Sequence, residues 1–298
     1  MVYEDIARNK RNTFLLFFVF FLLIIGLGYI IGEIYGEPYS GIIIAFLISL
    51  FSIYTTYYHS DKIILTFAGA KRANPNFYRT LYNIAEGLSI AAGIRTPQIY
   101  ILKDSNINAF ATGRNPEHSA VAVTQGILQI LNDEELEGVL AHELAHIKNR
   151  DILISSIAAT LAGVIMMLAS FARWAAIFGG FSRDSEEEDG GGIFGLIFMA
   201  ILAPIAATLI QMAISRSREY LADSRGANFA KNPLGLANAL EKLNHASMRI
   251  PLEANPATSH MFIVNPLSGG SFVNLFSTHP PIEAVSYTHL RAHETSLH

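Results

Sequence analysis

The stretch Val139–Asp151, VLAHELAHIKNRD, carries two histidines four residues apart, with a glutamate directly after the first. A helix turns once in 3.6 residues, so His142 and His146 can direct both imidazoles at one point. Glu143 lies beside that point. The H-E-x-x-H spacing is typical of two zinc ligands and a general base. Two core histidines beside a solvated glutamate are the alternative, so the metal interpretation requires a third ligand elsewhere.

The composition indicates a membrane protein. The chain has 298 residues, of which 51% are hydrophobic and 15% charged, and its mean hydropathy is +0.33. Soluble domains carry about 25% charged residues. The net charge of −4 gives no indication of nucleic-acid binding. Cysteine is absent, which excludes a disulfide framework and leaves histidine and carboxylate as the ligands for any zinc ion.

Four apolar runs are each long enough to cross a hydrocarbon core about 30 Å thick. They are Thr13–Gly32, Tyr39–His59, Ile152–Ala172 and Ile193–Ser215. We interpret the first as a retained anchor, because it is longer than the apolar core of a typical signal peptide. The last two are rich in small residues, which suit helix packing in lipid and also a buried hairpin in a soluble core.

Lysine and arginine gather on one side of these runs, whereas the loops 33–38 and 183–192 are acidic. By the positive-inside rule, both termini and the HELAH helix face the cytoplasm, and Arg173 is an exception. We therefore expect two transmembrane helices, the first part of a cytosolic domain, a transmembrane hairpin with an acidic external loop, and the second part of that domain. The corresponding residues are 1–59, 60–151, 152–215 and 216–284.

The cytosolic part is expected to combine helices with short strands. Asn132 and Glu135 form a capping-box pattern that starts the HELAH helix near Asp133. Nothing up to Asp151 breaks that helix, so it is free to continue into the third run. Helical spacing and three short strands precede it, at Asn76–Ala92, Pro97–Asp104, Ile107–Gly113 and Ala120–Gln125.

A third ligand is available after the last run. A catalytic zinc ion takes three protein ligands and one water. The stretch Ile214–Ala230 places Glu219 and Asp223 four residues apart, on one helical face. Glu219 can complete the set begun by His142 and His146, and Asp223 can accept the free N–H of a ligand histidine. A surface turn pairing both carboxylates with nearby arginines is the alternative, but the combination with HELAH favours the metal site.

This donor set predicts metal-assisted peptide hydrolysis. Zinc would lower the pKa of a bound water toward about 7 and polarise the scissile carbonyl. Glu143 would take the proton of that water and return it to the leaving amine. The sequence shows no Ser/His/Asp set of the kind that covalent hydrolases use.

With HELAH, the Glu219/Asp223 pair and four runs in this order, the chain resembles the HtpX-type membrane metallopeptidases, relatives of the CAAX prenyl endopeptidases. SREYLAD, NAFATG and STHPP also look like family motifs, and the resemblance extends over residues 1–284. It implies a membrane α-helical protein with four transmembrane helices and a cytosolic α+β, gluzincin-like peptidase domain, which holds one Zn²⁺ per chain. It also implies a stress-related enzyme of the bacterial or archaeal plasma membrane that cleaves membrane or misfolded proteins.

The resemblance further implies a substrate-binding strand beside the HELAH helix. An edge strand can pair with any peptide backbone, which suits broad specificity. The residues that would contact an extended substrate are Asn108, Ala109, Phe110 and Ala111.

The segment 285–298, VSYTHLRAHETSLH, departs from the family pattern, which predicts a basic amphipathic helix there. We interpret it as a foreign or disordered tail that contributes no ligand. Other functions remain as alternatives. An inactive membrane scaffold would be expected to lack Glu143 or Glu219, a CAAX-type processing peptidase would have more spans, and a channel or transporter would carry ionisable groups within the spans.

Overall fold

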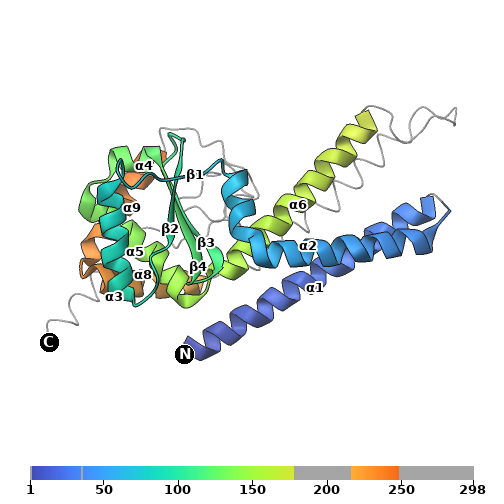
Figure 1. Cartoon of the computed structure of the whole chain (residues 1–298), viewed down its shortest axis with the longest axis horizontal. Coiled ribbons are helices and arrows are strands. Elements are labelled where there is room, and N and C mark those ends of the chain that lie inside the picture. Colours follow the sequence, from blue (N-terminus) through green and yellow to red (C-terminus); the bar gives the residue numbers. More distant parts are fainter. Residues whose placement is uncertain (1, 35, 178–215, 248–298) are drawn as a thin grey trace.

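The computed structural model describes residues 2–34, 36–177 and 216–247. The expectations for the fourth apolar run, for the loop 183–192 and for the tail 285–298 lie outside these residues. Two long helices, α1 (Val2–Ile34) and α2 (Pro38–Phe67), form a hairpin that projects away from the sheet (Figure 1). Both contain stretches long and apolar enough to cross a membrane, Asn9–Ile30 and Pro38–Phe67.

Small residues bring the two helices of the hairpin together. A Cβ atom on Gly28 would lie 2.3 Å from Ala45 Cβ and 2.6 Å from Gly41 O, so only glycine permits this approach. Large apolar side chains along the outside stay exposed, among them Phe14 and Phe51, each more than two-thirds exposed. The hairpin therefore combines a tight internal contact with an apolar surface that suits lipid.

The third apolar run becomes helix α6 (Ile152–Ile177), which leaves the sheet on the same side as the hairpin (Figure 1). Its first half is buried: Ile154, Ile157 and Leu161 are fully enclosed and pack in one cluster with side chains of α1 and α2. This half of the run is therefore an interior helix of the protein, as the small residues in its sequence allow.

A four-stranded sheet lies beside these helices, with the order β1-β2-β4-β3. Strands β2 and β4 are parallel, whereas β1–β2 and β3–β4 are antiparallel. The strands are β1 (Lys71–Arg72), β2 (Gln98–Leu102), β3 (Ala109–Asn115) and β4 (His118–Thr124). The last three confirm the three strands expected from the sequence, to within two residues at each end. The two-residue β1 was not expected.

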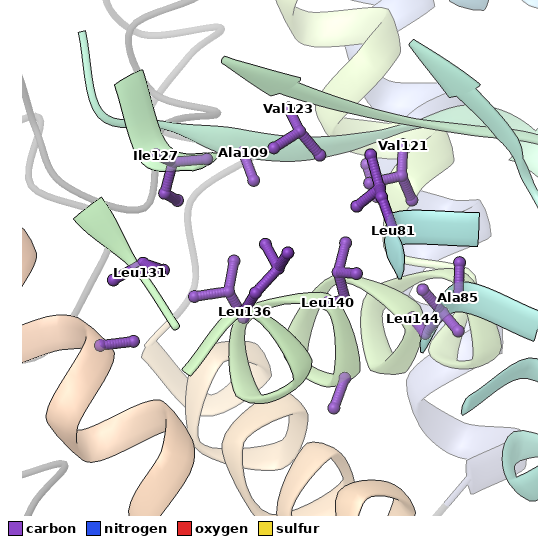
Figure 2. Close-up of a cluster of buried hydrophobic side chains, with 14 of the residues drawn as sticks. Leu81, Ala85, Ala109, Val121, Val123, Ile127, Leu131, Leu136, Leu140 and Leu144 are labelled. Atoms are coloured by element: carbon purple, nitrogen blue, oxygen red, sulfur yellow. The ribbon is translucent and has the colours of Figure 1, made fainter. Parts of the chain in front are cut away.

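Both faces of the sheet are covered. Figure 2 shows one face, where Ala109, Val121 and Val123 lie opposite Leu136 and Leu140 of the HELAH helix. Helices α3 (Arg79–Ala92) and α4 (Gln125–Ile130) add side chains to the same cluster. On the other face, alternate strand residues pack against the end of α2 and the start of α6. Complete burial of a valine or leucine side chain stabilises the fold by about 1.5–3 kcal/mol.

The HELAH helix is α5 (Asp133–Asn149). The expected capping box is present, since Asn132 Oδ1 accepts from Glu135 N and Glu135 Oε2 accepts from Asn132 N, both at 2.9 Å. The helix does not continue into the third run, which corrects the expectation from sequence. Arg150 takes a left-handed backbone conformation, with φ 61°, and ends it.

Two later helices pack on α5, namely α8 (Arg216–Ala230) and α9 (Pro233–Ser247). Gly226 lets α8 approach closely, because a Cβ atom there would lie only 3.0 Å from His142 N. Arg225 of α8 donates a hydrogen bond to Asn149, and Lys242 of α9 lies 2.8 Å from a carboxylate oxygen of Glu135. The contacts of Gly226 and Arg225 hold the acidic residues of α8 over the histidines of α5, and the Lys242 contact holds α9 against the start of α5.

Candidate metal centre

Three side chains from two helices meet at one point. His142 and His146 lie one turn apart on α5, and Glu219 comes from the first turn of α8. The two Nε2 atoms are 3.1 Å apart, and Glu219 Oε2 lies 3.6 Å from that of His142 and 3.5 Å from that of His146. One ligand atom of each residue falls within 4.8 Å of the others. The expected triad is thus brought together, and its role as a ligand set stays a prediction.

A carboxylate lies behind each histidine. Asp223 Oδ1 is 2.9 Å from His142 Nδ1, and Asp151 Oδ2 is 3.1 Å from His146 Nδ1. An ionised carboxylate only accepts hydrogen bonds, so each Nδ1 donates and each Nε2 faces the centre. Asp223 occupies the place expected from sequence, on the face of α8 that it shares with Glu219.

Sequence reasoning missed Asp151, because this residue is not part of the helix. In a continuous helix, a residue five positions after His146 would lie about 140° around the axis from it. The left-handed turn at Arg150 instead brings Asp151 back, and its backbone N–H donates to His146 O at 3.1 Å. The only signal in the sequence was an acidic residue at the expected end of α5.

The α1–α2 hairpin supports Asp151 in turn. Asn9 Nδ2 of α1 donates to Asp151 Oδ1 at 3.0 Å, and an Arg218 guanidinium nitrogen lies 3.5 Å from Asn9 Oδ1. All three residues are buried. A continuous set of polar contacts therefore links α8, the start of α1 and the second histidine, and no sequence pattern connects residues so far apart.

The surrounding carboxylates control the charge of both histidines. Burial alone lowers the pKa of His142, but its hydrogen bonds with Asp223 and Glu219 outweigh burial and raise that pKa to about 9. Burial also lowers the pKa of His146, and Glu219 and Asp151 raise it well above its ordinary value. The centre therefore favours a positive charge, carried either by protons on the rings or by a metal cation.

This donor set fits zinc. Two imidazole nitrogens and one carboxylate oxygen form a three-ligand catalytic set, which leaves a fourth position for water. The second nitrogen of each ring is already bonded to a carboxylate, an arrangement that fixes the tautomer and orientation of metal-binding histidines. The residues present therefore match the metal that the H-E-x-x-H spacing implies.

Glu143 lies next to this centre, on the following position of α5, and is only 4% exposed. Burial raises its pKa, while the nearby histidines and a hydrogen bond from the Ala111 backbone lower it in part. A buried carboxylate with a raised pKa accepts and returns a proton more readily than a solvated one.

The Ala111 backbone belongs to β3, the outer strand of the sheet. Asn108 O accepts from Thr124 N at 3.0 Å. The backbone N–H and C=O groups of even-numbered residues in this segment therefore point toward β4, and those of odd-numbered residues point away from it. Gly113 N, which faces away, donates to Ser156 Oγ of α6 at 3.2 Å. The side chains of residues 108–111 are all buried. A peptide alongside β3 would therefore contact the backbone of β3. This contact would end at Gly113, whose amide is already bonded to Ser156.

The contact with Asp151 makes a prediction for metal affinity. Asp151→Asn should weaken metal binding by about 10–100-fold, because it removes a negative charge that orients His146. Competition with a chromophoric chelator measures this on the purified full chain. Glu86→Gln, which removes an exposed carboxylate of α3, is the matched control and should leave the affinity unchanged. Wild-type affinity in Asp151→Asn would show that Asp151 only helps to end α5.

The chain is similar to proteins of one known family. Residues 76–284 match the family described as peptidase family M48. A "Protease HtpX homolog" from Desulfatibacillum aliphaticivorans is 56% identical over 254 residues, which are 85% of this chain and 81% of the relative. Relatives of the same name are 54% identical, over 92% of this chain and 96% of the relative in Syntrophobacter fumaroxidans, and over 88% of both in Thermococcus kodakarensis.

A solved structure is also similar, at a greater distance. The crystal structure of S. mikatae Ste24p aligns with a TM-score of 0.45 and 16% identity, over 95% of this chain and 65% of the other. The present chain thus spans less than two-thirds of that protein. The family match over residues 76–284 and the close relatives over most of the chain show that this protein belongs to peptidase family M48.

Proposed function

We propose that the chain is a zinc-dependent endopeptidase of the plasma membrane, which hydrolyses peptide bonds of membrane or misfolded proteins in protein quality control. The observation that carries this proposal is the convergence of His142, His146 and Glu219 beside the buried Glu143. The family match and the relatives named as proteases support the same activity.

One zinc ion per chain would be held by His142, His146 and Glu219. When bound, zinc supplies a water of pKa near about 7 and an electrophile for the substrate carbonyl. Asp223 and Asp151 keep the two rings turned toward the centre, through the hydrogen bonds that they accept from Nδ1. The ligand geometry therefore depends on three carboxylates outside α5, those of Asp151, Glu219 and Asp223, as well as on the H-E-x-x-H spacing.

Glu143 moves the proton. Its carboxylate takes a proton from the attacking water and delivers it to the amine nitrogen of the leaving peptide. The hydroxyl of that water joins the carbonyl carbon, so no covalent bond to the protein forms. The backbone amide of Ala111 donates to this carboxylate and so holds it at the edge of β3.

The substrate would lie along the outward edge of β3. The backbone of Ala109 and the carbonyl of Ala111 face away from β4 and would pair with an extended peptide, whereas the Ala111 amide donates to Glu143. Ser156 takes the amide of Gly113, so pairing would end before that residue. Main-chain pairing depends little on the side chains of the substrate, which suits an enzyme that acts on many unfolded segments.

Proteolysis by the detergent-purified full chain tests the proposal. We expect cleavage of an unfolded membrane protein, loss of cleavage with a chelator, and recovery when zinc is added back. Cleavage that persists in the chelator would exclude the metal mechanism. A protein that binds the substrate and never cuts it would be an inactive scaffold, and one that cuts only prenylated C-terminal peptides would be a CAAX-type processing enzyme.

The membrane orientation gives a further prediction. The basic flanks of the first two runs predict that residues 60–151 are cytoplasmic and that the loop 33–38 is external. A membrane-impermeant thiol reagent on intact cells should therefore label Glu37→Cys and spare Ser105→Cys. The native chain has no cysteine, so each label reports one site. Both positions are exposed in the structure.

Permeabilised cells supply the control for this experiment, because both variants should then be labelled equally. The reverse pattern in intact cells, with Ser105→Cys labelled and Glu37→Cys spared, would invert the proposed topology and place the metal centre outside the cell.

A further inference from the structure

A cavity of about 760 Å³ lies where α2 meets the sheet. Its walls come from the end of α2, from β1, from the segment before β2 and from the turn between β3 and β4. Of the described residues that line it, none belongs to the candidate metal centre. The proposed peptidase function gives this cavity no role.

The cavity begins at the level where α2 changes from apolar to polar. From Pro38 to Ser60 this helix carries no Asp, Glu, Lys or Arg, and exposed tyrosines then appear at Tyr54, Tyr57 and Tyr58. Tyrosine is enriched at the boundary between hydrocarbon and headgroups. The helical backbone is interrupted at His59, directly after these residues. Tyr54 and Tyr58 both line the cavity, so its opening is at the headgroup level of a bilayer crossed by α2.

The lining is rich in positive charge. Lys62, Arg72, Arg95 and Arg114 contribute four cations, against the two carboxylates of Asp61 and Glu117. Within residues 2–34, 36–177 and 216–247, none of these four cations forms an ion pair with a carboxylate. A concave surface lined with cations of this kind raises the local concentration of anions.

One of the four cations is held in place. A guanidinium nitrogen of Arg114 lies 3.2 Å from His118 Nε2, and its carbon lies 5.3 Å from the centre of the Tyr58 ring. Arginine only donates, so His118 Nε2 accepts and its Nδ1 donates to Asn115 Oδ1 at 2.9 Å. These contacts orient the imidazole and Arg114, and most of the five N–H groups of Arg114 are available for an oxyanion.

We propose that this cavity binds the phosphate group of an anionic phospholipid from the leaflet on the side of the sheet. The cations supply charge-assisted hydrogen bonds to phosphate oxygens, and the tyrosines contact the glycerol and the start of the acyl chains. The inference requires that α2 crosses a bilayer and does not depend on peptidase activity. A free phosphate compound shares the same chemistry, so the test separates the two sources.

The test measures binding to the detergent-purified full chain. Short-chain phosphatidylglycerol is titrated while the thermal unfolding midpoint is followed, since a ligand of the native state raises that midpoint. We expect phosphatidylglycerol to raise it, and phosphatidylcholine and glycerol phosphate to have little effect. The double variant Arg95→Gln/Arg114→Gln should bind phosphatidylglycerol about tenfold more weakly or worse.

Arg79→Gln/Lys103→Gln is the matched control. It removes the same charge from exposed positions outside the cavity and should keep wild-type affinity. If the first double variant does not fold, Lys62→Gln/Arg72→Gln removes the other two cations of the cavity and should weaken binding in the same way. Equal shifts with phosphatidylcholine, or unchanged affinity in a folded cavity variant, would overturn the proposal. An equal shift with glycerol phosphate would assign the site to a soluble phosphate compound instead.

Discussion

Glu143→Gln should abolish peptide hydrolysis and leave metal binding intact. Glutamine keeps the size of the side chain and cannot accept the proton of the attacking water. General acid–base groups accelerate reactions by about 10²–10⁴-fold, so the cleavage rate of the variant should be lower than that of the wild type by at least this factor. Glu143 lies beside the ligand group and is not one of its three members. Metal analysis and a cleavage assay on the same preparation measure the two effects separately.

Glu134→Gln serves as the control for this change, because it alters an exposed carboxylate on the same helix. It should keep both zinc and activity. Full activity in Glu143→Gln would remove this residue from the mechanism, and loss of zinc would make it a ligand.

Glu219→Ala should cause the largest loss of metal affinity among single changes on α8. It removes one of the three donor atoms that lie within 4.8 Å of one another. Asp223→Asn removes only the partner of His142 Nδ1, so its expected loss is smaller, about 10–100-fold. Chelator competition ranks the two variants against the wild-type chain.

The order of the two effects is the decisive result. If Glu219→Ala and Asp223→Asn both retain wild-type zinc content, the carboxylates of α8 are surface charges, as the alternative from sequence held. If Asp223→Asn loses more zinc than Glu219→Ala, the roles of the two residues are exchanged. Glu241→Gln, an exposed carboxylate on α9, should change neither value.

The parts of the site that follow helical periodicity were predictable from the sequence. His142 and His146, and likewise Glu219 and Asp223, are four residues apart, and i, i+4 residues share a helical face whatever the surrounding fold. Only the meeting of the two helices needed further information. The sequence contains one trace of it in Gly226, which has no side chain to hold α8 away from α5.

The parts that depend on the end of a helix or on long-range packing were not predictable. Asp151 reaches His146 only because Arg150 takes a left-handed conformation, which is unusual for a residue other than glycine. Strand β1 has two residues, too few for an alternating pattern to identify it. The sequence left open whether the first half of α6 is buried in protein, because an apolar run rich in small residues fits both lipid and a protein core.

The hydrogen bond from Asn9 to Asp151 has a mechanical consequence. Helix α1 has 33 residues, which corresponds to a rod about 50 Å long. Asn9 is the first residue of its apolar stretch, and Asp151 and then His146 follow it in a chain of direct contacts. A helix adjusts its tilt to the thickness of the bilayer around it. In a bilayer crossed by α1, such a tilt would displace Asn9 and, through Asp151, change the orientation of the His146 ring in the candidate metal centre.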